Sequence, residues 1–153
     1  MSISMKDVKK LREETGARIL DCKKALESAD GDFKKAIAIV AEKGLARAEK
    51  NVDRETKSGL ITSYVHNNGL VAAMVEIQCE TDFVAQNDEF KKMAYDIAMQ
   101  ITAMGPENVE ELLKQDFVKE PSKTVELALK ALSGKIGEKM VIKRFVKYVV
   151  GEK

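Results

Sequence analysis

The stretch LVAAMVEIQCETDFVAQNDEF, residues 70–90, passes from one hydrophobic periodicity to another within a few residues. Its first half places alternate apolar residues on one face: Val71, Ala73, Val75, Ile77 and Cys79. This alternation predicts a strand with one packed face and one partly hydrated face. In its second half, Asn87 or Asp88 can cap an amphipathic helix. The stretch therefore predicts an α+β domain, with its strand and helix joined at Asp82 and Phe83.

The segments on either side of this stretch complete a sheet. Gly59–Val65 alternates in the same way, and HNNG at residues 66–69 predicts a hairpin turn because Asn and Gly tolerate positive φ. Met140–Val150 is rich in Val, Ile, Phe and Tyr and predicts the last strand. We expect a three-stranded antiparallel sheet that is covered on one face by helices.

Shorter helices are predicted between the hairpin and the last strand. Besides the helix after Asn87, apolar spacing indicates helices over Val109–Leu113 and Val125–Leu132. Pro121 can begin the second of these, because a proline lacks only an N–H that is unpaired in a first turn. We expect Gly134 and Gly137 to interrupt the chain again before the last strand.

The N-terminal third of the chain predicts three short helices. Ser4 can cap the first, Thr15-Gly16 ends it, and Asp32 can cap the third. The second helix carries one apolar stripe: Cys22, Ala25, Leu26 and Ala29. Helices of this length would form a compact bundle.

A charged segment then separates two predicted domains. Residues 46–59 contain almost no large apolar side chains, which favours a solvated helix end and a linker. We therefore predict an N-terminal three-helix module with its linker over residues 1–53. An α+β core domain would follow over residues 54–153.

Composition restricts the class of protein. The chain of 153 residues is 44% hydrophobic and 33% charged, as in globular proteins. Its 26 Lys and Arg residues nearly balance 25 Asp and Glu residues, which argues against a dominant phosphate-binding role. The first residues carry no apolar signal core, and no segment approaches the ~20 apolar residues of a membrane span. We expect a soluble cytoplasmic protein with reduced thiols.

The common catalytic arrangements are missing from the pattern. A nucleophilic pair of Cys79 and His66 would place the two residues at opposite ends of the hairpin, so we interpret His66 as a surface residue and both cysteines as core residues. SGKIG at residues 133–137 has Ile136 where a phosphate loop needs Ser or Thr, and we interpret it as a loop. No acidic or His cluster has metal-ligand spacing. We expect a binding protein without catalytic residues, metal or cofactor.

Two interpretations of Phe83 compete at the joint. In the first, Phe83 is a core residue at the head of a helix, Thr81 is the N-cap, and Asp82 is favoured by the helix dipole. In the second, Phe83 is an exposed apolar wedge, and Asp82 could perturb a nearby cation or phosphate site. The pattern alone favours the core residue.

Four segments resemble a known family. TGARILDCKKAL at residues 15–26 and CETDFVA at residues 79–85 resemble the two signatures of bacterial elongation factor Ts. EPSKTV at residues 120–125 and GKIGEKMVIKRF at residues 134–145 resemble its C-terminal part. The resemblance spans nearly the whole chain. It implies a guanine-nucleotide exchange factor that acts on elongation factor Tu during protein biosynthesis.

The resemblance also implies site residues. The first domain would be a three-helix bundle similar to ubiquitin-associated domains, and Arg12, Ile19 and Leu20 would contact the nucleotide-binding domain of elongation factor Tu. Arg18 departs from the glycine that the family often has there. The element formed by Thr81, Asp82, Phe83 and Val84 would enter beside the magnesium site, with Phe83 as a wedge between partner helices. This implication reverses the interpretation of Phe83 as a core residue.

The length of the chain suggests a homodimer, and two rival functions stay open. The chain has room for one sheet subdomain and resembles the short form, in which two copies pair. The last strand, with Phe145, Tyr148 and Val149, and the Val125–Leu132 helix are candidates for a homodimer contact. The rival functions are a ubiquitin-like-binding adaptor and a translation-associated RNA-binding protein that uses a basic group on the last strand: Lys143, Arg144 and Lys147.

Overall fold

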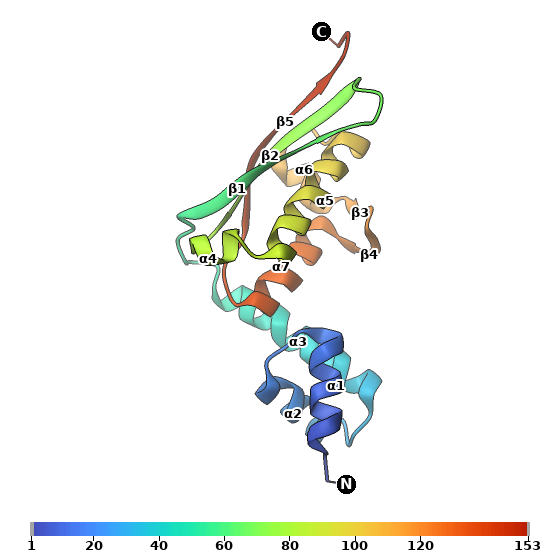
Figure 1. The fold of residues 1–153 in the computed structure, drawn as a ribbon, viewed down its shortest axis with the longest axis vertical. Helices are drawn as coiled ribbons and strands as arrows, with labels where there is room; N and C mark the ends of the chain where they lie inside the picture. Colours follow the sequence, from blue (N-terminus) through green and yellow to red (C-terminus); the bar gives the residue numbers. More distant parts are fainter. Residues whose placement is uncertain (1, 153) are drawn as a thin grey trace.

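The computed structural model describes residues 2–152 and divides into two parts along its long axis (Figure 1). The elements are, in chain order, α1 (Met5–Thr15), α2 (Ile19–Ser28), α3 (Phe33–Lys50), β1 (Ser58–Val65), β2 (Val71–Cys79), α4 (Asp82–Ala85), α5 (Asp88–Met104), α6 (Val109–Lys114), β3 (Asp116–Phe117), β4 (Glu120–Thr124), α7 (Val125–Ile136) and β5 (Val141–Val149). Helices α1 to α3 form one end, and the remaining elements form the other.

The sheet has the predicted antiparallel arrangement. Strand β2 lies in the middle, with β1 and β5 on its two sides. Val75 is opposite Thr62 of β1 and Phe145 of β5. The inner face of β2 is buried at every second residue: Ala73, Val75, Ile77 and Cys79. The alternation in the sequence therefore describes this strand correctly.

Helices α5, α6 and α7 cover one face of the sheet (Figure 1). Helix α5 is capped by Asn87, whose Oδ1 accepts hydrogen bonds from the N–H groups of Glu89 and Phe90 at 2.8 and 3.3 Å. Its buried apolar face includes Phe90, Ile97 and Ile101 and packs on β1 and β2. This confirms an α+β fold with a three-stranded antiparallel sheet.

Three predictions for the C-terminal half were wrong. Pro121 lies in β4, which pairs with β3 in a small hairpin that the sequence did not indicate. Helix α7 instead begins after Thr124, whose Oγ1 accepts a hydrogen bond from Leu127 N–H at 3.1 Å. Gly134 lies inside α7, so residues 133–136 are helical rather than a loop, and the helix ends at Gly137 with φ 92°. A left-handed glycine at that position is a common helix end.

The N-terminal helices surround a small cluster of their own. The buried apolar residues are Val8, Leu11, Cys22, Ala25, Leu26, Ala29 and Ala36. The predicted caps are present: Ser4 Oγ accepts from Asp7 N–H at 3.2 Å, and Asp32 Oδ1 accepts from Lys35 N–H at 3.0 Å. Gly16 ends α1 at φ 66°, as the sequence predicted.

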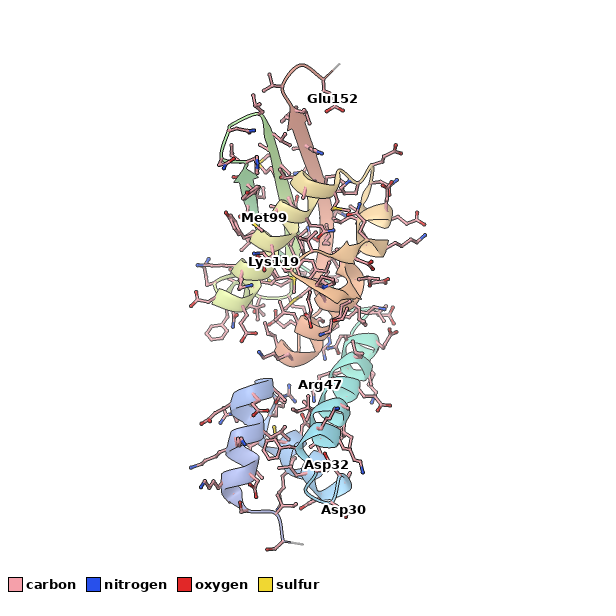
Figure 2. All side chains as sticks on the ribbon, turned by 90° about the vertical axis from the view of Figure 1, so that its right-hand side faces the viewer. Asp30, Asp32, Arg47, Met99, Lys119 and Glu152 are labelled. Carbon is pink, nitrogen blue, oxygen red and sulfur yellow. The ribbon has the colours of Figure 1, made fainter. Side chains whose placement is uncertain are left out.

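Helix α3 joins this cluster to the rest of the molecule by crossing α7. A Cβ atom on Gly134 would overlap the carbonyl oxygen of Gly44, so the two backbones approach more closely than larger residues would allow. Arg47 donates to the Gly134 carbonyl at 2.9 Å and to Asp21 of α2 at 2.7 Å, and Figure 2 shows it between the two parts. The beginning of the charged segment is therefore packed rather than solvated.

Candidate functional site: the corner after β2

The corner consists of Thr81, Asp82, Phe83 and Val84 and connects β2 to α5. Thr81 is extended, and its Oγ1 accepts a hydrogen bond from Val84 N–H at 3.3 Å, which caps the short helix α4 as predicted. Val84 is buried and anchors the corner in the core of the sheet domain. Phe83 points the other way and is 86% exposed.

The exposure of Phe83 decides between the two interpretations of the pattern. A core phenylalanine would be excluded from water, so the interpretation of Phe83 as a core residue was wrong. Exposing so much aromatic surface costs free energy unless a partner covers it. The corner is therefore a candidate contact for another macromolecule.

Glu138 connects the corner to the loop between α7 and β5. Its Oε1 accepts hydrogen bonds from the N–H groups of Glu80 and Thr81 at 3.1 and 3.0 Å. Its Oε2 accepts from Thr81 Oγ1 at 2.7 Å. In return, Glu80 Oε1 accepts from Lys139 N–H at 3.2 Å, and Arg54 lies 3.4 Å from the same carboxylate. Glu138 was not among the predicted site residues, because nothing in its local sequence pattern indicates a contact with residues 80 and 81.

Two further hydrogen bonds, at Asp82 and at Cys79, hold the corner in place. Ser58 of β1 donates to Asp82 Oδ1 at 2.7 Å, so the carboxylate is held beside the edge of the sheet. Cys79 is buried, and its thiol donates to the Thr81 carbonyl at 3.2 Å. Burial raises the pKa of the Cys79 thiol from 9.0 to about 11, and the Glu138 carboxylate adds to the rise. The thiol is therefore protonated and unreactive near neutral pH.

The N-terminal site residues lie in the other part of the molecule. Ile19 and Leu20 form the first turn of α2 and are 45% and 60% exposed. Arg12 is exposed in the last turn of α1. The three residues are thus close in sequence and accessible, but they do not contact the corner. Figure 1 shows α2 and α4 on the same side of the molecule, one in each part.

The loop between α1 and α2 lies against the end of α7. A Cβ atom on Gly137 would lie 3.2 Å from the Arg18 guanidinium, and one on Gly16 would overlap the Lys135 side chain. Arg18, the residue that departs from the family pattern, is therefore beside the loop that carries Glu138. The two parts of the molecule are therefore close to each other at this loop as well as at the crossing of α3 and α7.

The outer face of the sheet also exposes apolar residues. Ile61, Met74 and Tyr148 lie on it, and Tyr148 is 73% exposed. Arg144, which was a candidate for RNA binding, pairs with Glu76 at 2.8 Å on the same face. Most apolar residues of α7 are buried within the chain, and Leu127, which is 36% exposed, is the large apolar residue that this helix presents to solvent.

His66 is exposed at the hairpin and both cysteines are free and buried, as predicted. Within residues 2–152, no group of three or more His, Cys, Asp or Glu side chains is arranged to hold a metal ion. In the same range, no helix is both long and apolar enough to cross a membrane. The structure is thus an α+β protein with two exposed apolar sites that are candidates for binding a partner.

Comparisons with known proteins identify the family. The family model described as Elongation factor TS matches residues 80–153. Elongation factor Ts of Thermotoga sp. (strain RQ2) is 40% identical, with 99% of this chain and 98% of the relative covered. Elongation factor Ts of Thermodesulfovibrio yellowstonii is 38% identical with the same coverage, and that of Aquifex aeolicus is 49% identical over 97% of this chain and 53% of the relative. The chain belongs to the elongation factor Ts family.

The first two alignments run over 195 and 196 residues, whereas this chain has 153. These relatives therefore contain residues that this chain lacks, although 99% of this chain aligns with them.

Proposed function

We propose that this chain is a guanine-nucleotide exchange factor of translation elongation that acts on elongation factor Tu in the cytoplasm. Family membership supports the class of function. The observation that carries the mechanism is the exposure of Phe83 on a corner that is otherwise anchored in the core. The chain makes and breaks no covalent bond in this role.

The two parts of the molecule have different roles in this proposal. Residues 1–53, arranged like a ubiquitin-associated domain, dock on the nucleotide-binding domain of elongation factor Tu through Arg12, Ile19 and Leu20. Residues 54–153 present the corner. Phe83 inserts between partner helices, and Asp82 approaches the magnesium site, so that the contacts to GDP are loosened. Ile19 and Leu20 are exposed in one part of the molecule and Phe83 is exposed in the other, which supports this division.

Exchange needs only a difference in affinity. A factor that binds the nucleotide-free partner more tightly than the GDP form weakens GDP binding by the same ratio, because the two equilibria are linked. A 1,000-fold weakening corresponds to about 4 kcal/mol of coupling. Burial of one phenylalanine contributes about 1.5–3 kcal/mol, so docking and the displaced ion contact must supply the remainder.

Release of a fluorescent GDP analogue from elongation factor Tu, followed by stopped flow, tests the proposal. The release rate is expected to rise with the concentration of this chain and to reach a plateau. An unchanged rate at all concentrations would contradict it. Binding of ubiquitin-like proteins without GDP release would favour the adaptor, and RNA binding with steep salt dependence would favour the RNA-binding protein.

We also propose that two copies of the chain pair through the outer face of the sheet. Exposed Ile61, Met74 and Tyr148 support this, because one uncovered sheet face with large apolar side chains favours association. Sedimentation equilibrium is expected to give a dimer at the concentrations of the exchange assay. A monomer over that whole range would exclude the pairing.

A further inference from the structure

We propose that Glu138 is a positioning residue for the exchange corner: its carboxylate sets the orientation from which Phe83 acts. The inference rests on the proposed function. Glu138 itself does not reach the tip of the corner, since its hydrogen bonds go to Glu80 and Thr81 at the base. Its effect would therefore pass through the backbone.

The corner needs such support because α4 has little stability of its own. It contains 4 residues, whereas isolated helices shorter than ~12–15 residues are marginal in water. The side chain that would act on the partner, Phe83, is exposed and so contributes no packing within the chain. Val84 and Ala85 anchor only the buried side of the turn. Besides the bond from Ser58 to Asp82, the direction of Phe83 therefore depends on contacts at the entry to the turn.

Glu138 satisfies the groups at that entry. One carboxylate oxygen receives two consecutive backbone N–H groups, and the other receives the hydroxyl of the N-cap residue Thr81. Hydrogen bonds to a charged acceptor are stronger than neutral ones. The bond to the Thr81 hydroxyl also orients the oxygen that caps Val84 N–H at 3.3 Å. Glu138 thus controls both the backbone path and the cap.

The position of Glu138 is itself restricted. It follows Gly137, which has φ 92° at the end of α7, and the buried Ser133 hydroxyl donates to the Glu138 carbonyl at 2.6 Å. The return bond from Lys139 N–H to Glu80 closes the contact between the two loops. A side chain on a fixed loop can hold a corner more precisely than one on a mobile loop.

Loss of Glu138 should alter the rate of exchange more than the stability of the fold. Thr81 is exposed and Glu80 is half-buried, so water can replace the carboxylate at these N–H groups. Water would not fix the direction of the chain, and the corner would occupy several orientations. Docking through Ile19 and Leu20 would be unaffected.

The test is a stopped-flow titration of GDP release with the full chain. Glu138→Ala is expected to lower the maximal release rate about tenfold while the half-saturating concentration stays unchanged. Glu138→Gln is expected to restore the rate to within about twofold, because its amide oxygen can accept both N–H groups and its NH₂ can donate to Thr81. Glu49→Ala removes a 3.0 Å contact to Lys130 that involves no residue of the corner, so it is the matched control and should behave as wild type.

The outcomes separate this inference from the proposed function. A wild-type maximal rate for Glu138→Ala, beside a slow Phe83→Ala, would overturn the role of Glu138 and leave the exchange function standing. A wild-type rate for both variants would overturn the wedge mechanism as well. A raised half-saturating concentration at an unchanged maximal rate would assign Glu138 to folding or docking and also overturn the inference. Should Glu138→Ala fold poorly, Ser133→Ala carries the same test with an expected decrease of about threefold.

Discussion

The two exposed apolar sites are built in different ways. Ile19 and Leu20 stand on a helix whose other face packs on its own small cluster, so neighbouring residues suffice to present them. Phe83 stands on a turn that depends on Glu138, 57 residues away from Thr81 in the sequence. A local surface of the first kind suits docking, which tolerates small shifts. A surface of the second kind suits an element whose direction determines a rate.

Phe83→Ala tests the corner most directly. The variant should fold normally, because the ring is exposed, and it should lower the maximal rate of GDP release by about tenfold to 100-fold, as the loss of a buried Phe implies. Stopped-flow titration measures this rate, and circular dichroism checks the fold. Release at the wild-type rate would show that the corner does not determine the release rate, and the distinction from the docking site would fail.

The crossing of α3 and α7 gives the next largest effect. Gly134→Ala should destabilise the fold by about 2 kcal/mol, since its Cβ would overlap the Gly44 backbone and force the two parts of the molecule to separate. Gly44→Ala is the matched control: its Cβ would lie 3.9 Å from Gly134, an ordinary contact. The control should be neutral or more stable by up to about 1 kcal/mol. Urea denaturation of both variants measures the difference, and equal stabilities would contradict the close approach.

Leu20→Ala tests whether the docking site affects affinity without affecting the release rate. It should raise the half-saturating concentration about tenfold and leave the maximal release rate unchanged, because the contact would serve affinity rather than the release step. Val118→Ala removes a similarly exposed apolar side chain away from both sites and should have no effect. A lower maximal rate for Leu20→Ala would mean that docking and release are not separate.

The smallest effect concerns the thiol beneath the corner. Because the pKa of Cys79 is raised from 9.0 to about 11 in the folded chain, its stabilising contribution is present below pH 9 and is lost as pH rises through 11. Between pH 8 and pH 10 the loss is about 1 kcal/mol. Urea denaturation at the two pH values measures the free energy of unfolding. Its decrease from pH 8 to pH 10 should be larger in wild type than in Cys79→Ala by this amount. An equal decrease in both chains would show that the pH dependence does not come from Cys79.

The regular elements could be predicted from the sequence because their signals are local. The alternation around Val75, the HNNG turn, and the caps at Ser4 and Asp32 each depend on residues within one element. The β3–β4 hairpin was missed because Pro121 also suits a first helical turn. Gly134 was wrongly predicted to interrupt the chain. A glycine is required there because the backbone of Gly44, in another helix, occupies the position of a Cβ atom.

The site was less predictable for a related reason. Thr81 as a cap follows from its spacing to Val84, and the structure confirms it. The direction of Phe83 does not follow, because in such a short helix Phe83 and Val84 compete for the core, and periodicity does not decide between them. Only the resemblance to the family favoured exposure. The contacts of Glu138 depend on the tertiary path of the chain and have no local signal.

The length of α3 has a consequence for how the chain can change over evolution. The helix runs without interruption from Phe33 through the crossing at Gly44 to Lys50. Insertion of one residue before Gly44 would turn the N-terminal helices by about 100° about the helix axis and move them by about 1.5 Å. The orientation of Leu20 relative to Phe83 would then change. Substitutions on the outer surface of α3 are tolerable in this arrangement, whereas insertions and deletions ahead of the crossing are not.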